Sequence, residues 1–112
     1  MGLSAELEMF TGTEGYHNIL GVNVTDGVKY LMDKAKCYWL ITDIIAVVTC
    51  HEKVKTAPFQ IWTLKVNIQN HTAILTCKED TSSPILYTQR YEYTDFPLAE
   101  IKLYRISGVI LL

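Results

Sequence analysis

Residues 62–68 read WTLKVNI, with apolar side chains at every even position and polar ones between them. Strict alternation is typical of a β-strand with one buried face and one face in water. The chain that follows, up to Leu112, contains further apolar runs separated by turn residues. We therefore expect residues 58–112 to form an antiparallel β-meander, and the first half of the chain to cover its buried face.

About five strands are expected in this meander, separated by turn residues such as Gln69-Asn70-His71 and Ser107-Gly108. The last strand is apolar throughout, so it is either buried or an edge that pairs with a second copy, unless a short tail follows it. The expected strands cover Phe59–Ile68, Thr72–Lys78, Ile85–Tyr93, Ile101–Ile106 and Val109–Leu112.

Two or three helices are expected before the sheet, within about residues 4–52. Ser4–Phe10 and Thr25–Ala35 each begin with an N-cap residue and carry apolar side chains on one face. Cys37–Cys50 is ambiguous: its β-branched residues favour a strand, but its length and the grouping of its aliphatic side chains favour a buried helix. Tyr16–Val24 has no regular pattern and is expected to be a loop, with room for a short extended piece. The predicted fold is α+β, a single domain over residues 1–112 with N-terminal helices on one face of the sheet.

Composition argues against several classes of function. A net charge of −2 and the lack of any Lys/Arg run argue against nucleic-acid binding. The longest apolar stretch, Cys37–Cys50, is interrupted by Asp43 and is shorter than the roughly 20 residues that cross a bilayer. The N-terminus lacks the basic segment of a signal peptide. We expect a cytoplasmic protein that does not bind a membrane.

No motif for a nucleophile, a phosphate-binding loop or a zinc site is present. The cysteines have no C-x-x-C spacing and are expected to be reduced, buried residues. The histidines fall in three separate predicted loops, and no cofactor is expected. These residues are Cys37, Cys50 and Cys77, and His17, His51 and His71.

Three Thr-Asp pairs form the strongest polar pattern, with carboxylates at Asp26, Asp43 and Asp95. Three carboxylates brought together would hold a divalent cation such as Mg²⁺. The alternative function is therefore a small metal-dependent nuclease or phosphodiesterase. Against this, Asp26 suits the first turn of a helix and Asp95 suits a turn. Asp43 lies among aliphatic residues, so it needs a partner in either interpretation.

Aromatic residues are concentrated in the predicted sheet. Tyrosine combines a large contact area with a hydroxyl group, which suits interfaces. Alternatively, the tyrosine face packs under the helices. A third hypothesis is a small-molecule pocket between helices and sheet, near Trp39 and Trp62. The expected binding surface comprises Tyr87, Gln89, Tyr91, Tyr93, Phe96 and Tyr104.

Four segments are TDGVKYL at 25–31, YWL at 38–40, PFQIW at 58–62 and YTDFPLAEIKLY at 93–104. Together they resemble a family of small uncharacterised prokaryotic proteins that plasmids and phage-like elements often carry. The resemblance extends from about Leu7 onward. It implies no activity and transfers no functional residue, but it implies a mobile-element setting, which favours a partner-binding or counter-defence protein.

The absence of a catalytic pattern and the surplus of aromatic and aliphatic strand surface favour a non-enzymatic interaction module. Such a module would bind a protein partner, or form a homodimer through its C-terminal strands.

Overall fold

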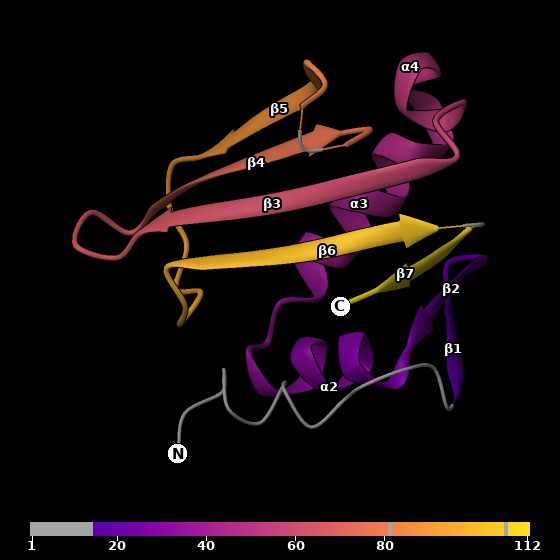
Figure 1. Cartoon of the computed structure of the whole chain (residues 1–112). Helices are drawn as coiled ribbons and strands as arrows, with labels where there is room; N and C mark the ends of the chain where they lie inside the picture. The colour runs from indigo at the N-terminus through magenta and orange to yellow at the C-terminus, as the bar shows by residue number, and fades with distance from the viewer. Residues whose placement is uncertain (1–14, 81, 107) are drawn as a thin grey trace.

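The computed structural model describes residues 15–80, 82–106 and 108–112. Within these residues, seven strands form one sheet and three helices lie against one of its faces (Figure 1). The fold is α+β, as expected. The helices are α2 (Asp26–Lys34), α3 (Tyr38–Cys50) and α4 (Glu52–Lys55). The strands are β1 (Tyr16–Ile19), β2 (Val22–Thr25), β3 (Phe59–Asn67), β4 (Thr72–Lys78), β5 (Ile85–Tyr91), β6 (Glu100–Ile106) and β7 (Val109–Leu111). The helix expected at Ser4–Phe10 lies outside the described residues.

The sheet differs from the predicted five-stranded meander. Its strand order is β1-β2-β7-β6-β3-β4-β5, and it is mixed because β2 and β7 run parallel. Only β3, β4 and β5 follow one another as a meander. The chain then returns past the end of the β3–β4 hairpin, where the Thr94 amide donates to the His71 carbonyl and the Val66 amide donates to the Ala99 carbonyl, both at 2.7 Å. The chain crosses the sheet end at this point, so β6 pairs with β3 on the side opposite to β4.

The prediction of a loop over Tyr16–Val24 was wrong, because β1 and β2 form a hairpin there. The helices consequently lie in the middle of the chain, between β2 and β3, and not at its start. The hairpin was missed because its turn consists of Leu20 and Gly21, where an Asn-Gly pair would have signalled it. Both turn residues have positive φ angles, and the Gly21 amide donates to Oδ1 of Asn18 at 3.2 Å.

The helices α2 and α3 confirm the helices predicted at Thr25–Ala35 and Cys37–Cys50, within a residue or two at each end. Length decided the ambiguous stretch in favour of a helix, since α3 has 13 residues and buries a broad aliphatic face. The charged segment after Cys50 contains α4, a single helical turn. Glu52 stands in its first turn and Lys55 in its last, which complements the helix dipole.

The core lies between the helices and the inner face of the sheet. Trp62 and Leu64 are almost fully buried, as the alternation in WTLKVNI predicts, and Trp62 lies between Cys77 and Leu103 in the sheet. Ile68 falls beyond the end of β3 and is 52% exposed. No helix in the described part of the chain is both long and apolar enough to cross a membrane.

One buried polar side chain connects the sheet to α4. Gln60 is fully buried, and its amide donates to the carbonyls of Val54 and Ala57. Its Oε1 accepts the indole N–H of Trp62 at 2.9 Å. Because this network satisfies both ends of the amide, a polar residue is tolerated inside an aliphatic core.

Candidate functional site

A cleft of about 380 Å³ lies between α3 and β5, and we call it the α3–β5 cleft. The helix contributes one carboxylate, one exposed thiol and two small apolar side chains, and β5 contributes a tyrosine and a glutamine. In the part of the chain that the structure describes, no Lys or Arg lines the cleft. Its lining residues are Asp43, Ala46, Val47, Cys50, His51, Tyr87 and Gln89.

The strand register explains why the tyrosines of β5 face the helices. Tyr87, Gln89 and Tyr91 pair with the inner-face residues of β4, so they point toward α3. The Tyr91 hydroxyl donates to Oδ2 of Asp43 at 2.7 Å, and its ring lies edge-on to Trp39. Burial, reinforced by the hydrogen bond to this carboxylate, raises the pKa of Tyr91 well above its usual value. Tyr91 is therefore the partner that Asp43 requires.

The remaining polar groups of the cleft contact one another. The Tyr87 hydroxyl donates to Oε1 of Gln89 at 2.9 Å, and the His51 ring lies edge-on to Tyr87. Within the described residues, no hydrogen bond joins Cys50 to His51, and Nδ1 of His51 is buried without a partner. A nucleophile–base pair requires such a bond.

The face of the sheet that points away from the helices carries an apolar cluster, which we call the C-terminal apolar patch. Phe59, Ile106 and Val109 form one row across β3, β6 and β7, and a second row lies beside it. The Phe59 and Tyr104 rings lie 6.3 Å apart. No described helix covers this face (Figure 1). The patch comprises Phe59, Ile61, Tyr104, Ile106, Val109 and Leu111.

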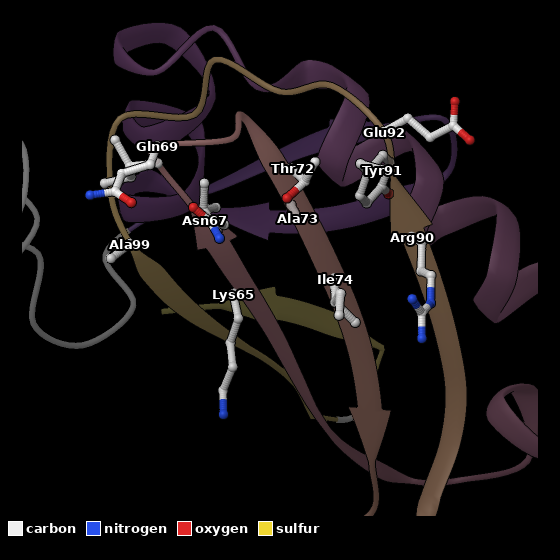
Figure 2. Close-up of a pocket in the computed structure, with 12 residues that line it drawn as sticks. Lys65, Asn67, Gln69, Thr72, Ala73, Ile74, Arg90, Tyr91, Glu92 and Ala99 are labelled. Carbon is white, nitrogen blue, oxygen red and sulfur yellow. The ribbon is translucent and has the colours of Figure 1, made fainter.

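Beyond the patch the same face is mixed, with charged side chains beside the exposed Ile74. A hollow of about 890 Å³ lies at the β3–β4 hairpin end, and Figure 2 shows Lys65, Ile74 and Arg90 side by side on three neighbouring strands there. A smaller hollow of about 220 Å³ continues to Ile61 of the patch. Its charged lining has both signs, with Lys65, Lys78, Lys102, Asp80 and Glu100. These hollows offer amide, hydroxyl and charged groups to a polar ligand.

The structure does not bring the six predicted surface residues into one surface. Tyr87, Gln89 and Tyr91 lie together on the helix side of β5. Tyr104 lies on the opposite face of the sheet, in the C-terminal apolar patch. Tyr93 is 71% exposed and stacks on His71, and Phe96 is buried in the core.

The three aspartates of the metal hypothesis are also separate. Asp26 lies 2.8 Å from Nε2 of His17 at the start of α2, Asp43 is bound by Tyr91, and Asp95 is exposed. Across residues 15–80, 82–106 and 108–112, no group of three or more His, Cys, Asp or Glu side chains is arranged to hold a metal ion. The structure therefore gives the metal-dependent alternative no support.

Neither tryptophan lines the cleft or the two hollows, although both were considered for a pocket. Trp62 belongs to the core, and Trp39 supports Tyr91.

Most of the patch was not expected from the sequence. The signal was present in FQI at 59–61, where apolar residues at odd positions break the alternation of β3 and indicate apolar side chains on both faces.

A family model described as a family of unknown function, DUF6876, matches residues 1–112. This match confirms the resemblance to an uncharacterised family. No curated protein and no solved structure matches the chain.

Proposed function

The chain belongs to DUF6876, a family of unknown function, and we propose from its own surfaces that it is a cytoplasmic, non-enzymatic interaction module that forms a homodimer. The C-terminal apolar patch is the surface that joins the two copies. A mobile-element setting is part of the same proposal and comes from the family resemblance. In that setting the protein would act by binding other proteins and not by catalysis.

The observation that carries this proposal is that no helix in the described part of the chain covers the patch (Figure 1). Its six side chains lie in two adjacent rows on the open face, and Ile106 remains 41% exposed. A contiguous apolar surface of this kind, rimmed by polar residues, is typical of a protein–protein interface. Two aromatic residues within the patch, Phe59 and Tyr104, are of the kind that dominates the energy of such interfaces.

A second copy suits this surface because a two-fold interface must be complementary to itself. The polar border beside Ile61 carries Lys65, Lys78 and Lys102 together with Asp80 and Glu100. Because it has charges of both signs, acidic residues of one copy can pair with basic residues of the other. A partner of one charge would be matched less well.

The two copies do not dimerise by main-chain pairing through β7, although the sequence left this possibility open. β7 lies between β2 and β6, and both of its sides are paired. The C-terminal strands therefore offer their side chains and not a free edge.

Sedimentation velocity over about 1–200 μM protein tests the proposal, a range chosen because weak dimers dissociate within it. The chain has a mass of 12.8 kDa, and the wild-type protein is expected to approach twice that mass. Ile106→Lys places a charge in the patch at an exposed position and is expected to weaken the dimer at least about tenfold.

Ile68→Lys is the matched control, because Ile68 is also an exposed isoleucine but lies outside the patch. It is expected to dimerise like the wild type. A wild-type protein that stays at 12.8 kDa throughout, or an Ile106→Lys variant that dimerises unchanged, contradicts the proposal.

A further inference from the structure

The strand β5 is a free edge of the sheet. It pairs with β4 on one side, and it stands last in the strand order. Within the described residues, no main-chain hydrogen bond from another segment reaches its outer side. Its seven residues contain no proline and one charge, at Arg90, so little in its sequence prevents the addition of another strand.

An added strand would point every second side chain toward the helix side of the sheet, where the α3–β5 cleft lies. It would lie about 4.8 Å beyond β5, and residues opposite Tyr87 and Gln89 would point in the same direction as these two side chains. That direction is toward α3, where Tyr87 and Gln89 already line the cleft. The edge and the cleft are therefore two parts of one binding site.

The charge of the cleft favours the binding of a basic side chain. Asp43 supplies a carboxylate, and Oδ2 of that carboxylate accepts the Tyr91 hydroxyl. Among the described residues no Lys or Arg lines the cleft, and Arg90 points to the opposite face of the sheet. We propose that β5 binds an extended peptide segment of a partner protein, and that a Lys or Arg of this segment enters the cleft and pairs with Asp43.

Selection from a display library of random nine-residue peptides against the full chain tests this site. The selected peptides are expected to share a Lys or Arg at one position, within an alternating apolar pattern. Fluorescence anisotropy then measures the affinity of the best peptide for wild-type and variant proteins.

Asp43→Asn keeps an oxygen that can accept the Tyr91 hydrogen bond, so the fold is expected to be retained. Because the substitution removes the charge, the affinity for the peptide is expected to fall about tenfold or more. Asp95→Asn, at an exposed residue between β5 and β6 and outside the cleft, is the control and is expected to bind unchanged. N-methylation of alternate peptide amides distinguishes strand addition. Methyl groups on the set that faces β5 are expected to abolish binding, and those on the other set to leave it intact.

Three results overturn the inference: no peptide is selected, the selected peptides lack a basic residue, or Asp43→Asn binds them as well as the wild type does. Tolerance of both methylation patterns overturns strand addition. The sedimentation result does not depend on any of these, because the C-terminal apolar patch lies on the other face of the sheet.

Discussion

The three cysteines illustrate how the fold gives one residue type two chemical behaviours. Cys37 and Cys77 are fully buried, whereas Cys50 is exposed at the end of α3. Burial raises the pKa of the Cys37 thiol and of the Cys77 thiol to about 12. The Cys37 sulfur also lies 3.6 Å from the Leu31 carbonyl, to which it donates.

At pH 8 we therefore expect one thiol per chain to react rapidly with Ellman's reagent. A pKa of about 12 leaves only about one buried thiol in 10⁴ as the reactive thiolate at this pH, and the reagent must also reach it. All three thiols are expected to react in concentrated guanidinium, and Cys50→Ser is expected to remove the rapid phase. Two or three rapid equivalents in the native protein would show that the core opens readily.

Asp43 shows how far sequence reasoning reaches at this scale. A carboxylate within an aliphatic run indicates that a polar partner exists. The partner, Tyr91, lies 48 residues away in the sequence, and only the packing of α3 against β5 brings the two together. The need for a partner was predictable, but its identity was not.

At the scale of elements, the β1–β2 hairpin is the one that pattern reasoning missed. Leu20 and Gly21 have φ angles of 50° and 87°, which is the left-handed pair that a type I′ turn requires. Leucine in this region costs about 1 kcal/mol because its Cβ crowds the backbone, whereas asparagine tolerates it. Leu20 is 74% exposed, so it returns little packing energy for this strain.

Leu20→Asn is therefore expected to raise the free energy of unfolding by about 0.5–1 kcal/mol, as measured by urea denaturation. Gly21→Ala is expected to lower it by a similar amount, since alanine is strained at a φ of 87°. If Leu20→Asn destabilises the protein, the turn does not have the geometry described here.

At the scale of the whole molecule, the element types follow from local pattern but their order in the sheet does not. The alternation in WTLKVNI and the apolar stripe of α2 are properties of single segments, and both elements formed as expected. The position of β6 beside β3 depends on the crossing at Thr94–Ala99, and the parallel pair depends on residues almost 90 positions apart. The two proposed interaction surfaces depend on this order, because it leaves β5 at an edge and places β7 inside the sheet.

The pairing of β2 with β7 joins the β1–β2 hairpin to the last described strand. Val24 lies opposite Ile110, and both side chains are fully buried. Ile110→Ala is expected to cost about 2–5 kcal/mol, because it removes buried methylene groups and leaves a cavity. In a double-mutant cycle with Val24→Ala, the two substitutions are expected to couple by about 0.5–3 kcal/mol, since the residues are in contact across the strands.

Hydrogen exchange on Ile110→Ala reports whether the hairpin unfolds with the rest of the sheet. If β1 and β2 belong to one cooperative unit, the substitution lowers the protection of amides in β3 and β4 together with those in β2. If only β1 and β2 lose protection, the hairpin is a separate unit that opens alone. We expect the first result, because Ile110 also lies beside Arg105 of β6, the central strand of the sheet, and β6 pairs directly with β3. A loss of packing energy at β7 is therefore expected to destabilise the strands on both sides of it.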